Sequence, residues 1–238
     1  MSIKEKIVFG DFDSEKMEFD MSSRMPNAIQ EQEITETIPG KQGVIDYSMA
    51  FGQRIFQPGT IQYTFVKYCP TYAERHILEN LIKNKIMRFG ISKLYDSNIP
   101  KNYYFLAKCN SETVVVDDQT REVTVTLIFT YNPPFVFAEI AEGSDEWDTF
   151  NFDYDVSQQT SFDVNTGDVV CLINNGSATV QPKITIIGEI TVECNDETVT
   201  FSSGTYENTL IYLLPGMNVV SLVGSGSISF EFYKELVV

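Results

Sequence analysis

The segment Thr71-Tyr-Ala-Glu-Arg-His-Ile-Leu-Glu-Asn-Leu-Ile-Lys-Asn-Lys-Ile-Met-Arg-Phe89 decides the fold class, because it alone has a helical period among segments that read as strands. Its apolar residues recur every three or four positions: Ala73, Ile77, Leu78, Leu81, Ile82, Ile86 and Phe89. The outer face then carries Arg75, His76, Glu79 and Lys83. We predict one amphipathic α-helix over about residues 71–89.

The ends of this helix are marked by the residues that helix termini favour. Thr71 and Glu74 have the spacing of a capping box, in which each side chain satisfies a backbone amide at the N-terminus. Glu79 and Lys83 are four residues apart and predict an ion pair on the outer face. Gly90 suits the left-handed position that follows many helices.

The segments on both sides of the helix predict β-structure. Ser111–Val116 and Arg121–Phe129 flank Asp117–Thr120 and alternate apolar with polar residues, which predicts a hairpin. Residues 20–60 mix charges with prolines and glycines, a composition typical of short strands joined by extended loops. Loops of this kind often contact other chains.

Residues 139–238 show apolar runs of strand length separated by turn signals, with no helical stripe. The runs are Val169–Ile173, Ile184–Ile187, Ile190–Cys194, Glu197–Phe201, Leu210–Leu214, Val219–Val223 and Ile228–Phe232. Asn195-Asp196 predicts a two-residue turn and Gly224-Ser-Gly226 a hairpin turn. So many short strands in about a hundred residues predict a β-sandwich.

Charge divides the 238-residue chain, which has 17 Lys+Arg, 33 Asp+Glu and a net charge of −16. Residues 1–138 carry 15 basic and 17 acidic residues, a net of −2, whereas residues 139–238 carry Lys183 and Lys234 against 16 acids, a net of −14. The segment Asn132–Ala138 at this junction contains two prolines, which have no backbone N–H to donate to a sheet. We expect two domains, 1–138 and 139–238.

This composition excludes several classes of protein. An acidic chain lacks the clustered cations of a sequence-specific nucleic-acid reader. The first ten residues have too few apolar positions for a signal peptide, and no run approaches the ~18 apolar residues of a membrane helix, so we expect an unsecreted chain without membrane insertion. Four cysteines without a C-x-x-C pair and one histidine argue against zinc. We expect Cys69, Cys109, Cys171 and Cys194 to be reduced and packed as small apolar groups.

The candidate catalytic and metal-binding residues lack the pattern of a defined site. His76 lies on the predicted outer face, where a base lacks an orienting partner and a cleft. An acidic run without a cation consists of Glu142, Asp145, Glu146, Asp148, Asp153 and Asp155, interleaved with Trp147, Phe150, Phe152 and Tyr154. It could supply a glycosidase pair, a sugar-binding surface or, through Asp153 and Asp155, a Ca²⁺ site. A solvated loop between domains is the commoner reading, so we predict no catalytic, cofactor-binding or metal site, and no enzyme.

The order of several loose motifs along nearly the whole chain resembles the distal tail proteins of long, non-contractile-tailed phages and prophages of Gram-positive bacteria. In the first part, the matching features are Phe9-Gly10-Asp11 with Ser14, Ile38-Pro-Gly-Lys-Gln-Gly43, the capped helix, Lys93-Leu-Tyr-Asp96, Asn102-Tyr-Tyr-Phe105 and Leu127-Ile-Phe-Thr-Tyr-Asn-Pro-Pro-Phe135. In the second part, they are Asn174-Asn-Gly-Ser177, Pro182-Lys-Ile-Thr-Ile-Ile-Gly188 and Leu214-Pro-Gly-Met-Asn218.

The resemblance implies a mainly β protein with one helix, in which an N-terminal β-rich domain forms a ring and a galectin-like β-sandwich follows. It further implies a homohexameric virion component at the tail tip or baseplate, assembled in the host cytoplasm. Its partners would be the tail tube protein and a tail-associated baseplate or fibre protein. Two alternatives stay open on the residues alone: a carbohydrate-binding module that recognises cell-wall sugars, and a glycoside hydrolase.

Overall fold

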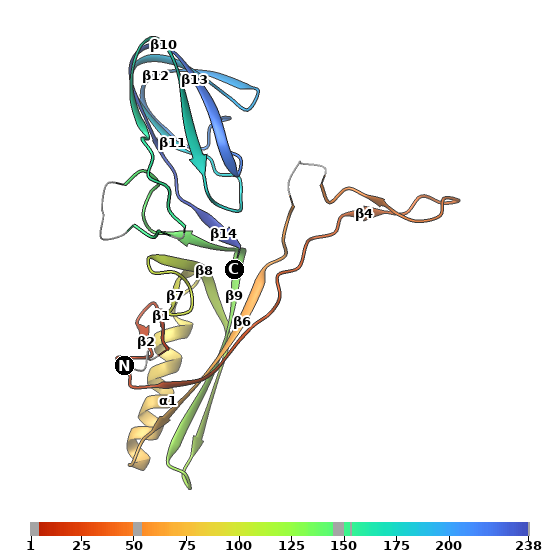
Figure 1. Cartoon of the computed structure of the whole chain (residues 1–238). Helices are drawn as coiled ribbons and strands as arrows, with labels where there is room; N and C mark the ends of the chain where they lie inside the picture. Colours follow the sequence, from red (N-terminus) through yellow and green to blue (C-terminus); the bar gives the residue numbers. More distant parts are fainter. Residues whose placement is uncertain (1–4, 50–53, 145–149, 153, 238) are drawn as a thin grey trace. The chain divides into compact units, whose positions relative to one another are not determined.

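The computed structural model describes residues 5–49, 54–144, 150–152 and 154–237, and divides into two compact units, Met1–Val136 and Phe137–Val237. Figure 1 shows that both units are predominantly β and that the first unit contains the helix α1. This confirms the predicted fold class. The two units are described separately below.

The first unit is built on one antiparallel sheet with the strand order β2-β1-β7-β8-β9-β6-β3. Its strands are β1 (Ile7–Phe9), β2 (Phe12–Asp13), β3 (Asp20–Pro26), β6 (Gly59–Tyr68), β7 (Ser92–Asp96), β8 (Tyr103–Asp117) and β9 (Glu122–Ala138). A separate two-stranded ribbon is formed by β4 (Thr35–Glu36) and β5 (Ile45–Asp46). Burial alternates along β6 and β9, as a sheet with one face on a core requires. That core is rich in aromatic residues, including Phe9, Phe65 and Phe129.

The α1 helix (Tyr72–Met87) begins as the sequence predicts, because the Thr71 side chain accepts a hydrogen bond from the Glu74 amide at 3.3 Å. The Glu79–Lys83 ion pair is also present, at 2.9 Å. The predicted C-terminus is wrong: the helix is capped by Arg88 in a right-handed conformation, and Gly90 is not left-handed. The chain leaves the helix towards β7 without the reversal that a left-handed residue would provide.

The predicted apolar stripe of α1 is only half covered. Ile82 and Ile86 are buried, whereas Ile77 and Leu81 are exposed. Arg75, expected on the outer face, is buried instead. The predicted stripe from Ala73 to Phe89 spans about 220° of the helix at ~100° per residue, which is wider than the surface that the sheet covers. The spacing of the apolar residues therefore predicts where the helix lies but not which of its faces is buried.

The predicted hairpin is confirmed, since β8 and β9 are neighbours joined by a turn in which Asp117 Oδ1 accepts the Gln119 amide at 2.8 Å. The prolines of Asn132–Ala138 do not interrupt β9, contrary to expectation. The β9 strand pairs with β6 as far as Tyr131, which lies opposite Gly59. Both prolines lie beyond that last pair, so the pairing with β6 requires no backbone amide from either of them.

The second unit contains one long four-stranded antiparallel sheet with the order β10-β13-β11-β12. The strands are β10 (Ser161–Asn174), β11 (Lys183–Cys194), β12 (Glu197–Tyr206) and β13 (Gly216–Glu231), and a short β14 (Glu235–Val237) follows. One face of the sheet is buried through residues such as Leu172, Val192 and Leu222. The covering layer is irregular, with a single bridge between Val180 and Leu213.

The strands of the second unit are fewer and longer than the sequence predicts. The Asn195-Asp196 turn is confirmed, with φ of 49° and 66° at its two residues. The Gly224-Ser-Gly226 turn is wrong, because both glycines lie inside β13. A Cβ on Gly226 would lie 1.8 Å from the Ile187 carbonyl oxygen. These glycines therefore let β13 approach β11 closely, so that predicted strands on either side of them merge into one.

Two further findings concern expectations from composition. Cys69, Cys109 and Cys194 are buried as free thiols, but Cys171 is exposed, because its side chain points to the outer face of β10. Within the described residues, no helix has the length and apolar character needed to cross a membrane.

Candidate functional site

The first unit carries an extended arm, which we define as residues 27–49 and 54–58. β3 and β6 pair as far as Pro26 and Ile61, and β6 stays in the sheet to Gly59 through its pairing with β9; beyond Pro26 and Gly59 the two chains leave the sheet. Backbone hydrogen bonds then join Gln32 to Ile55 and Gln57 to Gln30, both at 2.8 Å. The β4–β5 ribbon lies at the far end. Figure 1 shows the arm projecting away from the sheet that bears it.

The arm has almost no core of its own. Its exposed large apolar side chains are Ile34, Ile38, Val44, Tyr47 and Met49. Ser48 is its one buried polar residue among those described, with its Oγ accepting the Ile34 amide at 2.9 Å. An isolated two-stranded ribbon is marginally stable in water, and exposed apolar clusters mark contact surfaces. The arm is therefore a candidate contact surface.

The arm is also acidic. Its residues include Glu31, Glu33, Glu36 and Asp46 against Lys41 and Arg54, a net of −2. Hydrogen bonds from the Ser48 side chain and backbone hold the pKa of Asp46 below its ordinary value. Glu31 pairs with Arg54 at 3.3 Å on the returning chain. The arm thus presents exposed apolar side chains between carboxylate side chains.

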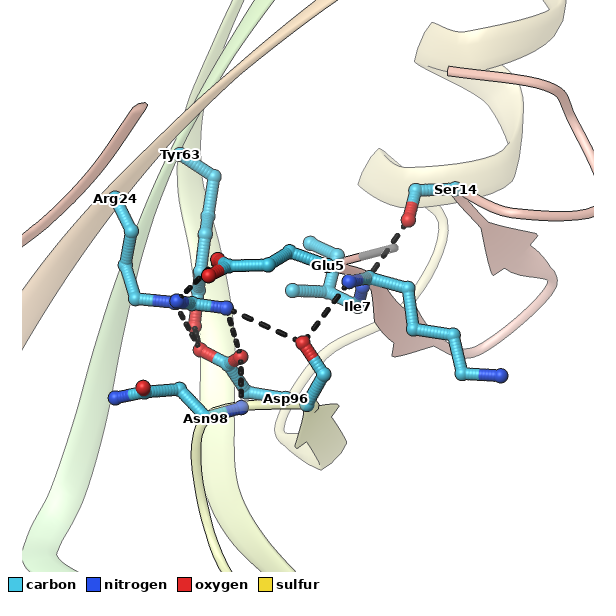
Figure 2. A network of polar contacts seen from close by, with 9 residues as sticks. Glu5, Ile7, Ser14, Arg24, Tyr63, Asp96 and Asn98 are labelled. Atoms are coloured by element: carbon cyan, nitrogen blue, oxygen red, sulfur yellow. Dashed lines mark hydrogen bonds and ion pairs between the residues drawn. The ribbon is translucent and has the colours of Figure 1, made fainter. Parts of the chain in front are cut away.

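A buried polar network fixes the strands from which the arm departs (Figure 2). Arg24 on β3 binds Asp96 at the end of β7 through two hydrogen bonds, of 2.9 and 2.5 Å. The Tyr63 hydroxyl on β6 donates to the same carboxylate at 2.7 Å. Burial, with the adjacent Asp96 charge, raises the pKa of Tyr63 far above its ordinary value, so the phenol remains a donor.

This network shows that the sheet curls. In a flat sheet, β3 and β7 would be about 19 Å apart, since four strand spacings of ~4.8 Å separate them in the strand order. The Arg24–Asp96 contact closes that distance to hydrogen-bond length. The arm is consequently anchored at two points, through the β3–β6 ladder and through a bidentate ion pair across the curled sheet.

A second ion pair fixes the N-terminal end of α1. Arg75 donates to Asp118 through Nε and Nη2, at 2.8 and 2.5 Å, and to the Cys69 carbonyl at 2.8 Å. Asp118 belongs to the β8–β9 turn, so the pair joins the helix to the hairpin. His76 remains partly exposed, as predicted, and packs on Tyr72 with ring centroids 4.3 Å apart.

The acidic run of the second unit differs from its predicted character at the residues that the structure describes. Glu142 and Asp155 are not free: buried Lys234 lies 3.0 Å from Glu142 Oε1 and 2.7 Å from Asp155 Oδ1, and also donates to the Tyr154 carbonyl. Burial raises the pKa of Glu142, while Lys234 opposes that rise. Asp145, Glu146, Trp147, Asp148 and Asp153 lie outside the described residues. Over the described part of the chain, no cluster of three or more metal-ligating side chains is present.

The exposed face of the second unit's sheet holds a pocket of about 290 Å³. It is lined by Gln159, Ser161, Phe162, Asp163, Thr185, Ile187, Ser227, Ile228 and Ser229. Hydroxyl groups dominate its polar lining, and Ser161 donates to Ser229 at 2.9 Å across the β10–β13 pair. The ring of Phe162 itself packs against buried Phe230 in the core, with ring centroids 6.4 Å apart.

The sequence reasoning missed the Arg24–Asp96–Tyr63 network and the role of Lys234. The Lys93-Leu-Tyr-Asp96 motif includes Asp96 but does not indicate its partners, which lie 72 and 33 residues away in sequence. Lys234 had one signal: it is one of two cations among 16 acids in residues 139–238. A cation so outnumbered is expected to have carboxylate partners.

No protein-family model and no curated protein matches this sequence. Among solved structures, the Dit protein of phage SPP1 is similar, with a TM-score of 0.67 and 13% identity over 97% of this chain and 98% of that chain. That structure is described as a paradigm of the hub adsorption apparatus in phages that infect Gram-positive bacteria. The phage P2 baseplate, in its activated conformation with calcium, gives a TM-score of 0.43 and 11% identity over 100% and 99% of the two chains, a likeness too low to support an argument. The chain has the fold of the SPP1 Dit protein, and the resemblance to distal tail proteins is thus confirmed at the level of the fold.

Proposed function

We propose that this protein is a structural component of a phage virion, a distal tail protein whose copies form a ring at the tail tip. The ring is a hexamer that joins the tail tube to the baseplate or fibre assembly, and it forms in the cytoplasm of the bacterial host. The observation that carries this proposal is the extended apolar arm, on a unit whose fold is that of the SPP1 Dit protein.

An arm on one side of a subunit favours a ring over a symmetric dimer. A surface that binds a different surface on the next copy makes a head-to-tail contact, and such contacts close into rings when the rotation permits. The arm is anchored by the Arg24–Asp96 pair and is therefore presented in a defined direction. A defined direction is what a closed ring needs from each of its subunits.

The proposed role involves no chemical turnover. The two described members of the acidic run, Glu142 and Asp155, are held by the same buried lysine. A glycosidase needs one carboxyl group free to donate a proton and another free to attack or to activate water. The Lys234 contacts occupy both groups, which disfavours the glycosidase alternative.

Native mass spectrometry and negative-stain imaging of the purified full chain test the ring. A hexamer has six times the mass of the 27.0 kDa chain, or 162 kDa. We expect a particle of this mass with a central hole. Only monomers at high protein concentration and high salt, with the tail tube protein also present, would contradict the proposal.

The dependence of ring stability on salt concentration gives a second test of the same proposal. Six subunits of −16 carry −96 in total, so their mutual repulsion opposes assembly at low ionic strength. The ring is expected to be more stable at 0.5 M than at 0.02 M salt. The reverse dependence, measured by the concentration at which the ring dissociates, would show that repulsion between subunits does not limit assembly.

Carbohydrate binding is a second candidate function, favoured by the hydroxyl-lined pocket on the second unit. Sugars are bound by convergent polar groups beside an apolar wall, here Asp163 with Ile187. Calorimetric titration of the full chain with cell-wall polysaccharide fragments tests this function. Binding that Asp163→Asn abolishes would support it, and the absence of heat at millimolar fragment would remove it.

A further inference from the structure

The strand β10 lies at one edge of the second unit's sheet, because the strand order is β10-β13-β11-β12. Its pairing with β13 runs from Ser161 to Asn174 without a register shift. In an edge strand, every second residue directs its backbone N–H and C=O away from the sheet, where no ladder satisfies them. A long and regular edge strand is therefore able to pair with another chain.

The side chain of Gln158 shows which residues of β10 face away from the sheet. Its Oε1 accepts the Ile173 amide and its Nε2 donates to the Ile173 carbonyl, both at 2.8 Å. These groups of Ile173 point away from β13, so the period of two gives Cys171, Val169 and Gly167 the same direction. Among the described residues, none makes a hydrogen bond to the backbone of these last three, which we call the free edge of β10.

The side chains beside the free edge are apolar and exposed. Val169 is 72% exposed, and Cys171 is also exposed. On β13, Val219 lies opposite Cys171 and Val223 lies opposite Gly167, and both valines are exposed. The free edge thus offers backbone hydrogen bonds, and the face beside it offers apolar contacts. Strand addition to a sheet uses this combination, in which the backbone gives affinity and alternate side chains give specificity.

The strands at the other ends of the two large sheets carry features that protect an edge. β2 has two residues, and β3 contains Arg24 and Pro26. The ladder between β11 and β12 has a register shift between Ile186 and Glu189. Short strands, charges, proline and bulges all disfavour pairing with another chain. The segment Val169–Ile173 of β10 has no charge, no proline and no register shift, so β10 is the edge best suited to an added strand.

The carboxylates near the free edge have no cation from their own unit. Asp168 follows Gly167 on β10, and Glu193 lies two strands away on β11; both are exposed. The cations of the unit are Lys183 and Lys234. Lys183 binds Glu231 at 3.4 Å, and Lys234 is buried in the ion pairs described above. Asp168 and Glu193 are therefore available to a cation from outside the unit.

This charge argues against a second copy of the chain as the occupant. Residues 139–238 of another copy would bring the same net charge of −14, with both lysines already paired. The arm of another copy is acidic as well, with a net of −2. Like charges disfavour a contact, whereas complementary charges steer and select a partner. The occupant that fits is an extended, basic segment of a different protein.

We infer that a basic segment of the tail-associated baseplate or fibre protein adds as a strand to the free edge of β10 and packs apolar side chains beside Val219 and Val223. This inference rests on the proposed function, which supplies the partner, and it names the surface through which the second unit binds that partner. The added strand would also cover an apolar edge strand that otherwise favours aggregation.

Two proline variants at opposite edges of the sheet test the backbone pairing. Val169 lies opposite Ser221 on β13, which lies opposite Glu193 on β11. Glu193 lies opposite Thr198 on β12, so Val169 and Thr198 are the two ends of one row. Hydrogen-bonded and non-hydrogen-bonded pairs alternate across such a row, so the Thr198 amide also points away from the sheet. Val169→Pro and Thr198→Pro therefore each remove one outward N–H and keep the ladders.

Calorimetric titration of the full chain with the purified tail-associated protein of the same phage measures the contact. Val169→Pro should weaken binding at least about tenfold, whereas Thr198→Pro should leave the dissociation constant within about twofold of the wild-type value. Hydrogen exchange measured by mass spectrometry should become slower in peptides of β10 in the complex and stay unchanged in those of β12. Equal effects of the two prolines, or unchanged exchange in β10, would overturn the inference.

A charge exchange at one position tests the basic character of the partner without proline. Val169→Lys and Val169→Glu remove the same exposed side chain, so both are expected to keep the wild-type unfolding temperature. A basic segment should bind the Lys variant at least about tenfold more weakly than the Glu variant at low salt, and the difference should shrink at about 0.5 M salt. Equal affinities or the opposite order would show that the occupant is not basic, contrary to the inference.

The outcomes separate this inference from the proposed function. If the ring binds the tail-associated protein and neither Val169→Pro nor Val169→Lys weakens binding, the partner uses another surface and the proposed function stands. If Val169→Pro changes the mass of the assembly that the chain forms alone, a second copy occupies the edge and the inference is wrong. A ring that does not bind the tail-associated protein would also overturn the inference. A wild-type chain that stays monomeric would remove the ring, whereas binding at the free edge is measured separately on that monomer.

Discussion

At the scale of single residues, two buried charged side chains stand out in this protein. Asp96 and Lys234 are each buried and each accompanied by several polar partners, as ionised groups inside a protein require. Both join segments that are distant in sequence. Their removal is expected to cost more than the loss of any exposed ion pair.

Asp96→Asn tests this expectation in the first unit. The side chain of Asp96 is 2% exposed and that of Glu5 is 54% exposed, and both bind Arg24. Asp96→Asn leaves a nearly buried guanidinium with only the exposed Glu5 carboxylate as an ionic partner, which should lower the free energy of unfolding by about 3–5 kcal/mol. Glu5→Gln should cost less than about 1 kcal/mol. Urea unfolding of the two variants measures the difference, and equal costs would show that burial of the pair is unimportant.

Glu142 makes the stability of the second unit depend on pH. Burial raises its pKa in the folded state above the ordinary value of 4.5, so the folded chain binds more protons than the unfolded chain over the window that begins at 4.5. The free energy of unfolding contributed by this group therefore falls as pH rises through that window. Glu142→Gln should flatten this fall in calorimetric unfolding of the full chain.

Glu231 supplies a control of opposite sign for that experiment. A hydrogen bond from Tyr233 is the largest cause that lowers the pKa of Glu231, so its stabilising contribution is present at higher pH and is lost as pH falls below 4.5. Glu231→Gln should change the pH profile below 4.5 and leave the window above it intact. Identical profiles for the two variants would contradict the assignment.

At the scale of elements, the packing of β11 against β13 depends on backbone that a side chain would displace. Gly188, Gly224 and Gly226 have φ of 104°, 144° and 144°, which favour glycine. Across the β11–β13 ladder, Gly188 lies opposite Gly226 and Gly224 lies opposite Ile190. The long strands of the second unit exist because these positions lack Cβ atoms.

Gly226→Ala should therefore be among the most destabilising single changes in the second unit. Its Cβ would meet backbone atoms that cannot move independently of the ladder, and we expect a loss of at least about 3 kcal/mol or failure to fold. Gly167→Ala on β10 is the matched control, since its nearest neighbour would be 3.7 Å away and its φ is not left-handed. That variant should change stability by about 1 kcal/mol or less in thermal unfolding. Similar effects of both substitutions would rule out close approach as the reason for Gly226.

At the scale of the whole molecule, the chain distributes its charge between two units. The acidic second unit supplies most of the net −16, while the first unit, which bears the arm and the helix, is nearly neutral. This distribution keeps repulsion low around the proposed ring contact. It also disfavours adhesion of the second unit to anionic polymers.

Separating the chain between Val136 and Phe137 is expected to give two folding units. Each has a core of its own, around Phe65 and Phe129 in the first and around Leu172 and Leu222 in the second. The first fragment should keep the ability to oligomerise. If residues 137–238 give the circular dichroism and collapsed NMR dispersion of an unfolded chain, the second core depends on residues of the first unit.

Much of the local structure could be read from the sequence. The Thr71 cap, the Glu79–Lys83 pair, the β8–β9 hairpin and the Asn195-Asp196 turn involve residues at most a few positions apart, where backbone preference and hydrogen bonding act directly. The division of charge between the two parts of the chain also follows from counting alone. These features can be predicted without knowing which surfaces of the folded chain come into contact.

Only the tertiary structure decided which surfaces are covered and which charges are paired. Periodicity placed Ile77 and Ile82 on one stripe, but the curled sheet covers the second and leaves the first exposed. Lys234 meets Asp155 from 79 positions away, and Arg24 meets Asp96 from 72. No local pattern records such contacts, because burial and pairing depend on the path of the chain through space, and that path brings together residues whose sequence neighbours are unrelated.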